Sequence, residues 1–118
     1  MNLKSIELIQ KERIRQIEEE GCTAEKDAEL GYGELALAGI AYASPVHIYR
    51  KVEFPTSIQF LDPYPWRGGI GDKRLDYSLP GVELPEHLIL NYHEKLDLLV
   101  KGAALIAAEI DKLIKENE

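Results

Sequence analysis

LDLLVKGAALIAAEIDKLI, residues 96–114, carries the longest helical pattern of the chain. Apolar side chains recur along it every three or four residues, at Leu96, Leu99, Ala103, Ile106, Ile110 and Leu113, which is the spacing of one helix face. Asn91 can cap the start of this helix, and Glu94 stands three residues later, as in a capping box. The pattern predicts a long C-terminal helix over residues 91–116 that forms the centre of a mainly α-helical fold.

Two shorter helices are predicted before it. Residues 5–20 place Ile6, Ile9 and Ile17 on one helix face, with Arg13 inside that face, and Gly21 is a natural helix stop. Residues 33–43 read GELALAGIAYA, and no charged residue occurs between positions 35 and 49. Since a helix that is apolar all round is usually buried, this second helix is predicted to lie in the core.

The centre of the chain has a different composition. Residues 61–87 hold four of the six prolines, and the segments before them resemble short strands in VHIYRKVEF and SIQF. We therefore expect a long loop or flap over residues 45–85 containing little β structure. The whole chain, residues 1–118, is predicted to be a single helical domain, a small bundle of three to four helices.

The charge and cysteine content exclude several function classes. The 118 residues carry a net charge of −7 with an isoelectric point of about 5.0, which disfavours non-specific nucleic-acid binding. One cysteine, Cys22, cannot form an internal disulfide or a cysteine zinc site. No apolar run of membrane-spanning length and no signal-peptide pattern is visible. These features predict a cytoplasmic protein without a membrane partner.

The segment YPWRGGIGDKR, residues 64–74, combines aromatic rings, cations and glycines. Tyr64 and Trp66 can stack on a base, and Arg67 and Lys73 can bind phosphate oxygens. The glycines let backbone N–H groups approach an anion. These residues predict a nucleotide site, although neither a Walker A loop nor a dinucleotide fingerprint is present. The alternative is a surface turn whose tryptophan fills the core.

Four acids form a second candidate site. If Glu20, Asp27, Glu34 and Glu109 met around one pocket, their oxygens would suit Mg²⁺. Otherwise each could be solvated or pair with a nearby lysine. Arg13, on the apolar face of the first helix, needs a partner because a buried unpaired charge is very unfavourable. We expect it to pair with Glu20, Glu34 or Glu109 and to line the ligand pocket.

Several short motifs are shared with a known group of proteins. They are ERIRQI at 12–17, EG at 20–21, Thr23, Asp27, GELA at 33–36, YA at 42–43, YPW at 64–66, LVK at 99–101, ALI at 104–106 and AEI at 108–110. This pattern resembles a family of small phage and prophage proteins of uncertain function, whose members often carry Trp where this chain has Cys22. The match covers both ends of the chain, and the middle only through YPW.

A more distant similarity is to the all-α nucleotide pyrophosphohydrolases of the MazG type. That resemblance implies compact helices, a nucleotide pocket and four carboxylates that hold Mg²⁺ through Glu-x-x-Glu and Glu-x-x-Asp motifs. Here Glu94 and Asp97 form a Glu-x-x-Asp on the polar side of the last helix, but Leu37 stands where the partner of Glu34 is expected. The incomplete metal site favours binding over catalysis and implies no cofactor, or Mg²⁺ if the protein is an enzyme.

Three functions remain open at this point. The first is a phage-encoded, anti-defence nucleotide sponge, which sequesters a host immune signalling nucleotide without cleaving it. The second is a Mg²⁺-dependent nucleoside triphosphate pyrophosphohydrolase, and the third is a protein–protein inhibitor. The expected ligand contacts are Arg13, Glu34, Tyr64, Trp66, Arg67, Lys73 and Glu109. A homo-oligomer is also expected, because residues 35–49 and the last helix offer more apolar surface than so short a chain covers.

Overall fold

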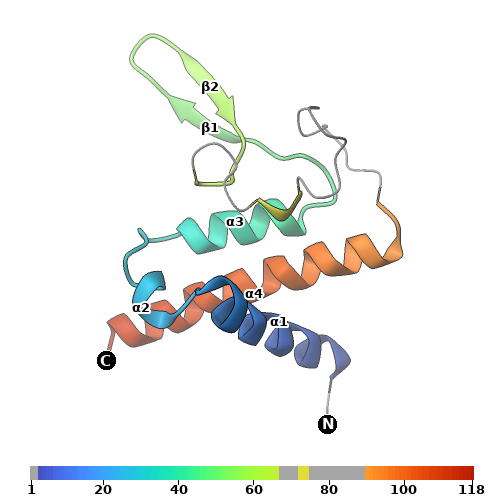
Figure 1. The fold of residues 1–118 in the computed structure, drawn as a ribbon. Coiled ribbons are helices and arrows are strands. Elements are labelled where there is room, and N and C mark those ends of the chain that lie inside the picture. The colour runs from blue at the N-terminus through green and yellow to red at the C-terminus, as the bar shows by residue number, and fades with distance from the viewer. Residues whose placement is uncertain (1–2, 67–71, 75–89) are drawn as a thin grey trace.

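The structure, a computed structural model, describes residues 3–66, 72–74 and 90–118. It is mainly helical, as predicted, with one small antiparallel sheet (Figure 1). The elements are α1 (Lys4–Glu20), α2 (Ala24–Asp27), α3 (Glu34–Ala43), β1 (Arg50–Glu53), β2 (Ile58–Leu61) and α4 (Tyr92–Glu116). Arg67 and most of the last part of the expected flap, residues 67–71 and 75–85, lie outside the described residues.

Local sequence signals set where the helices begin. The Asn91 side chain accepts from the Glu94 N–H and the Glu94 side chain accepts from the Asn91 N–H, so the capping box at the start of α4 is confirmed. Thr23 caps α2 by accepting from the Lys26 N–H. Gly21 ends α1 in the left-handed conformation, with φ of 71°.

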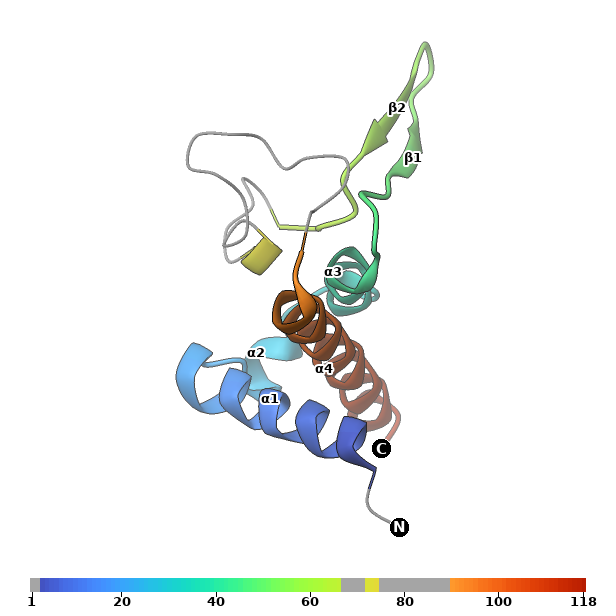
Figure 2. The same ribbon diagram turned by 90° about the vertical axis from the view of Figure 1, so that its right-hand side faces the viewer.

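α4 is the central element, and α1 and α3 pack on different sides of it (Figure 2). The backbones of α3 and α4 meet closely at Gly39 and Gly102. A Cβ atom added to Gly102 would lie 2.6 Å from the Gly39 carbonyl oxygen, so only glycine fits there. The core beside this crossing is small and rich in alanine: it contains Leu35, Ala38, Ala41, Tyr42, Tyr64, Leu105 and Ala108.

The predicted buried face of α1 is wrong. Ile6, Ile14 and Ile17 are 57%, 47% and 40% exposed, whereas Glu12 and Gln16 are buried. The polar row can be buried because its groups satisfy one another: Gln16 donates to Glu12 at 3.1 Å. α1 therefore turns polar side chains toward the interior of the structure and leaves three of its four isoleucines exposed, with Ile9 half-buried.

α4 shows the same inversion. Leu99, Ile110 and Leu113 of the predicted apolar face are 52%, 52% and 42% exposed. Leu98 and Leu105, on another side of the helix, are buried. The amphipathic pattern correctly predicts a helix. The side of α4 that packs within the chain, however, is the one that carries Gly102, Ala104 and Ala108.

β1 and β2 form a hairpin that extends away from the helices (Figures 1 and 2). Two short strands were expected in this part of the chain, and both are present. Ile58 and Phe60 on β2 are 55% and 65% exposed, so the hairpin adds little to the core. None of the helices in the described part of the chain is long and apolar enough to cross a membrane.

Candidate functional site

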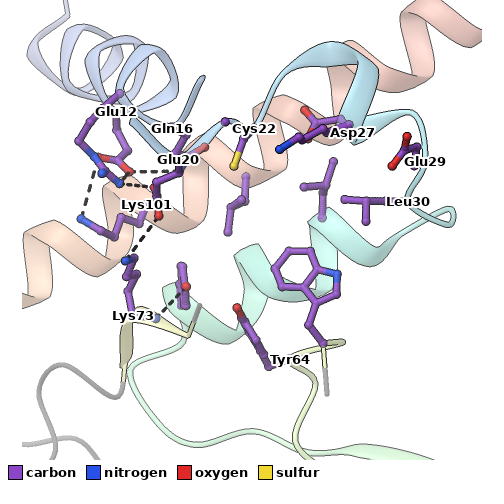
Figure 3. Close-up of a pocket in the computed structure, with 17 residues that line it drawn as sticks. Glu12, Gln16, Glu20, Cys22, Asp27, Glu29, Leu30, Tyr64, Lys73 and Lys101 are labelled. Atoms are coloured by element: carbon purple, nitrogen blue, oxygen red, sulfur yellow. Dashed lines mark hydrogen bonds and ion pairs between the residues drawn. The ribbon is translucent and has the colours of Figure 1, made fainter. Parts of the chain in front are cut away.

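A cavity of about 380 Å³ lies among α1, α2, α3 and α4, beside segments 64–66 and 72–74 (Figure 3). Its lining falls into an apolar part and a charged part. The apolar part comprises Leu30, Leu35, Tyr42, Tyr64, Trp66 and Leu105. The charged part comprises Glu12, Arg15, Glu20, Lys26, Asp27, Glu29, Lys73 and Lys101.

Three rings build the aromatic wall. The Tyr42 and Tyr64 rings are stacked with centroids 6.1 Å apart, and Trp66 meets Tyr64 edge-on at 5.1 Å. The Tyr42 hydroxyl accepts from the Lys73 backbone N–H at 2.9 Å. Burial raises the pKa of Tyr42 to about 12, so this hydroxyl is neutral at physiological pH. The wall is thus neutral and preformed: Tyr42 and Tyr64 belong to the core and are 5% and 9% exposed, and Trp66 packs against them.

A buried ion network holds Tyr64 in place. The Arg74 guanidinium donates to Asp62 at 2.8 Å and to Asp72 at 2.7 Å, and its Cζ lies 5.7 Å from the Tyr64 ring centroid. His47 adds a short contact to Asp62. This network ties residues 62–66 to residues 72–74 and so positions the aromatic wall. Sequence reasoning missed it because its members are spread over 28 positions, from His47 to Arg74.

The charged wall is a chain of paired groups from α1, α4 and segment 72–74. Arg15 donates to Glu12 at 2.7 Å and to Glu20 at 2.6 Å, and Glu20 lies 3.5 Å from the Lys73 Nζ. Lys101 approaches Glu12 at 3.9 Å. Burial alone would raise the pKa of Glu12, but the Arg15 hydrogen bond and the Lys101 charge lower it below its usual value. Glu12 is therefore a carboxylate at neutral pH.

Figure 3 shows how the two walls face each other. Glu12, Glu20, Lys73 and Lys101 gather on one side of the cavity, joined by interactions, and Tyr64 stands apart from them. Four cationic and four acidic residues line the cavity, so their formal charges cancel. Such a lining can pair with both the negative and the hydrogen-donating groups of one ligand.

Arg13 has a different partner from those predicted. It donates to Asp27 at 2.6 Å and weakly to Gln16 at 3.5 Å, and not to Glu20, Glu34 or Glu109. The cap at Thr23 starts α2 directly after α1, which brings Asp27 back against α1. Burial raises the pKa of Asp27 even though Arg13 lowers it.

Arg13 also lies away from the aromatic cavity. It lines a second hollow, of about 310 Å³, together with Asp27, Ile17 and Lys112. Arg13 is thus behind Asp27 and Gln16 rather than in the lining of the aromatic cavity, and the expectation that it contacts a ligand stays a prediction.

Glu34 and Glu109 do not line the aromatic cavity either. The Glu34 side chain accepts from the Gly31 N–H, and Glu109 accepts from the Ala36 N–H at 3.4 Å. Both acids thus support the backbone around the start of α3. Of the expected ligand contacts, the structure brings together Tyr64, Trp66 and Lys73, while Arg67 is outside the described residues.

The four proposed metal ligands do not meet. Glu20 and Asp27 line the cavity, but each is paired with an arginine, and Glu34 and Glu109 bond to backbone N–H groups elsewhere. Among the described residues, no group of three or more His, Cys, Asp or Glu side chains could hold a metal ion.

Several cavity residues were not predicted: Glu12, Arg15, Gln16, Lys26, Tyr42 and Lys101. A signal for Glu12 and Gln16 does exist in the sequence. Glu12 and Gln16 stand four residues apart, one above the other on α1, and Arg15 is their neighbour. Polar side chains on one side of a helix can be buried only if they form hydrogen bonds with one another. Tyr42 could have been predicted because its hydroxyl is the one polar side-chain group of α3 after Glu34.

Comparisons of this chain with protein-family models, curated proteins and solved structures find no match. The resemblances to phage proteins and to pyrophosphohydrolases therefore stay predictions.

Proposed function

We propose that this protein binds a small nucleotide in the cavity between the aromatic and the charged walls. The observation that supports the proposal is that Tyr64 and Trp66 line the same cavity as Lys73 and Lys101, with Tyr64 apart from the two lysines (Figure 3). Its volume of about 380 Å³ falls in the roughly 300–1,000 Å³ of small-molecule sites. A planar base fits the aromatic wall, and a phosphate fits the lysine side.

The charged wall also suggests how the ligand exchanges with internal contacts. Lys73 and Glu20 are about one-third exposed and 3.5 Å apart, so their attraction is weak. A terminal phosphate carries more charge than the Glu20 carboxylate and can take over the Lys73 ammonium. Glu20 keeps its contact with Arg15 at 2.6 Å, and its side that faced Lys73 can then accept from base amino groups or ribose hydroxyls.

The biological part of the proposal rests on the phage resemblance. In this proposal the protein is encoded by a phage, acts in the host cytoplasm and sequesters an immune signalling nucleotide without cleaving it. The separation of the four carboxylates favours this binder over the Mg²⁺-dependent pyrophosphohydrolase. A protein–protein inhibitor would not need an aromatic cavity. The homo-oligomer expected from the apolar composition belongs to the same proposal.

Binding can be measured directly because Trp66 is the single tryptophan and lines the cavity. Titration with mononucleotides, cyclic dinucleotides and cyclic ADP-ribose isomers should change its fluorescence for at least one class, with a matching calorimetric heat. Silence of every compound in both measurements would overturn the proposal. Extraction after denaturation should return the bound nucleotide unchanged, whereas pyrophosphate release with Mg²⁺ would favour the enzyme.

A pair of lysine variants separates the pocket from general charge effects. Lys73→Ala should weaken binding about tenfold or more, because it removes a cation beside the phosphate. Lys51→Ala removes the same charge from β1 on the exposed hairpin and should leave affinity unchanged. Equal losses in both variants would mean that the cavity is not the binding site.

A further inference from the structure

α4 carries an apolar seam along most of its length, exposed at five of its seven positions and half-buried at Leu96 and Ala103. Its members are Tyr92, Leu96, Leu99, Ala103, Ile106, Ile110 and Leu113, separated by alternating steps of four and three residues. This is the spacing of the core positions of a coiled coil. Leu99 and Ile110 in its centre are each 52% exposed. No ionisable side chain other than the Tyr92 phenol occurs on the seam.

The surroundings of the seam extend it. On one side α3 packs against it, since a Cβ on Gly39 would meet the Ile106 side chain at 2.7 Å, and the next residue, Ile40, is 45% exposed. The other side carries Val100, Ala107 and Ile114, all apolar. At 1.5 Å per residue, the seam from position 92 to 113 is about 32 Å long, or about six helical turns.

We infer that a second copy of this chain covers the seam, with the two α4 helices antiparallel. Around a two-fold axis midway between positions 104 and 105, Leu96 meets Leu113 of the second copy and Leu99 meets its Ile110. The small Ala103 then faces the bulky Ile106. A parallel pair would instead set Ala103 against Ala103 and leave a gap at the centre.

The flanking charges agree with the antiparallel arrangement. Lys95 stands directly before the seam residue Leu96, and Glu116 stands before position 117, where the next seam position would fall; both are exposed, and Glu116 also pairs with Lys112 of its own chain at 2.7 Å. In the antiparallel pair they lie on the same flank, offset by two residues or about 3 Å along the axis, so each lysine is close to a glutamate of the other copy. In a parallel pair Lys95 would face Val100 and gain no charge partner.

A net charge of −7 on each copy opposes self-association over most of the surface. The uncharged seam, bordered by opposite charges at its two ends, is where this repulsion is weakest. The seam is also complementary to itself in size and charge, which a surface for an unrelated protein does not need to be.

The first experiment measures mass and separates two exposed isoleucines. Light scattering at tens of micromolar should give about 27 kDa, twice the 13.3 kDa of one chain. Ile110→Glu should convert the protein to a monomer with an unchanged helical circular dichroism spectrum. Ile14→Glu changes an isoleucine of similar exposure on α1, 47%, and should remain a dimer. A monomeric wild type, or a dimeric Ile110→Glu, would overturn the inference.

The second experiment tests the orientation. In a Cys22→Ser background, the double variant Leu99→Cys/Ile110→Cys should form disulfides between copies under mild oxidation, because the two positions are paired across the seam. Leu99→Cys alone should not, since the two sulfurs would lie about 16 Å apart along the axis. Efficient cross-linking of the single variant, or none of the double variant, contradicts the antiparallel dimer.

Discussion

Glu12 is the buried acid on which the charged wall depends. Its pKa is lowered from 4.5 because the hydrogen bond from Arg15 and the charge of Lys101 outweigh burial. A carboxyl group with a depressed folded pKa stabilises the fold above its unfolded pKa, and this contribution is lost as pH falls through the folded value. Glu12→Gln should therefore lower the free energy of unfolding by about 1–3 kcal/mol at pH 7.

The comparison with wild type should be made by urea unfolding at several pH values. The difference between the two proteins should begin to shrink below pH 4.5, where the carboxyl group of the unfolded wild-type chain takes up a proton, and should vanish once the pH falls below the lowered pKa of the folded protein. Glu18→Gln, an exposed change on the same helix, should be nearly neutral at every pH. A Glu12→Gln deficit that does not depend on pH would assign the residue a packing role only.

The pair of Arg13 and Asp27 allows a second test at the scale of single residues. Their side chains are 13% and 7% exposed, so Arg13→Ala leaves a desolvated carboxylate without its partner. We expect a loss of about 3 kcal/mol at pH 7. Arg13→Ala/Asp27→Asn should recover much of it, because no charge is then buried. Thermal melts of the two variants measure this, and a double variant as unstable as the single one argues against the pair.

Nucleotide affinity gives the pair a second readout. Arg13 lies outside the aromatic cavity, so Arg13→Ala should still bind once folded. If the Arg13→Ala protein is folded but no longer binds the nucleotide, Arg13 contributes to the binding site.

At the scale of the elements, the crossing of α3 and α4 restricts which residues can occupy positions 39 and 102. Gly102→Ala adds a Cβ that would lie 2.6 Å from the Gly39 carbonyl oxygen, so α3 must move outward with Tyr42. We expect a net loss of about 1–3 kcal/mol, despite the gain of about 1 kcal/mol in helix propensity. Chemical denaturation measures it. Gly31→Ala, whose Cβ would have its nearest neighbour at 3.5 Å, is the matched control.

The positions of the helices in the sequence were easier to predict than the side of each helix that is buried. Asn91 and Thr23 cap helices through contacts within three residues, so the sequence alone locates the starts of α4 and α2, whereas α1 and α3 begin without a side-chain cap. The buried side of α1 depends on bonds between Glu12 and Gln16, which make a polar row fit for burial. Periodicity reports that a helix has an apolar face, but not whether the same chain or another one covers it.

The site was predictable to the same degree. Tyr64, Trp66 and Lys73 were found because rings, cations and glycines are concentrated in one segment. The rest of the cavity comes from α1, α2, α3 and α4, and those contributions depend on how the helices pack. Arg13 was expected to meet one of three acids but pairs with Asp27, because a four-residue helix returns the chain against α1.

At the scale of the whole molecule, the structure is less compact than is usual for its length. Its radius of gyration is 15.3 Å, whereas a compact chain of this length has about 13–14 Å. No large side chain in the described residues is less than 2% exposed, so the core offers limited hydrophobic stabilisation. Part of the stability should therefore come from association through the seam on α4.

This dependence makes thermal stability a function of protein concentration. For a dimer that unfolds to two chains, each tenfold increase in concentration adds about 1.4 kcal/mol of stability. The melting temperature should then rise by roughly 3–6 °C between 5 and 50 μM, with the Trp66 signal and circular dichroism giving the same midpoint. Ile110→Glu, which places a charge on the seam, should melt at a lower temperature that does not change with concentration. A wild-type midpoint independent of concentration would mean that a single chain is stable by itself and that the seam does not contribute to folding.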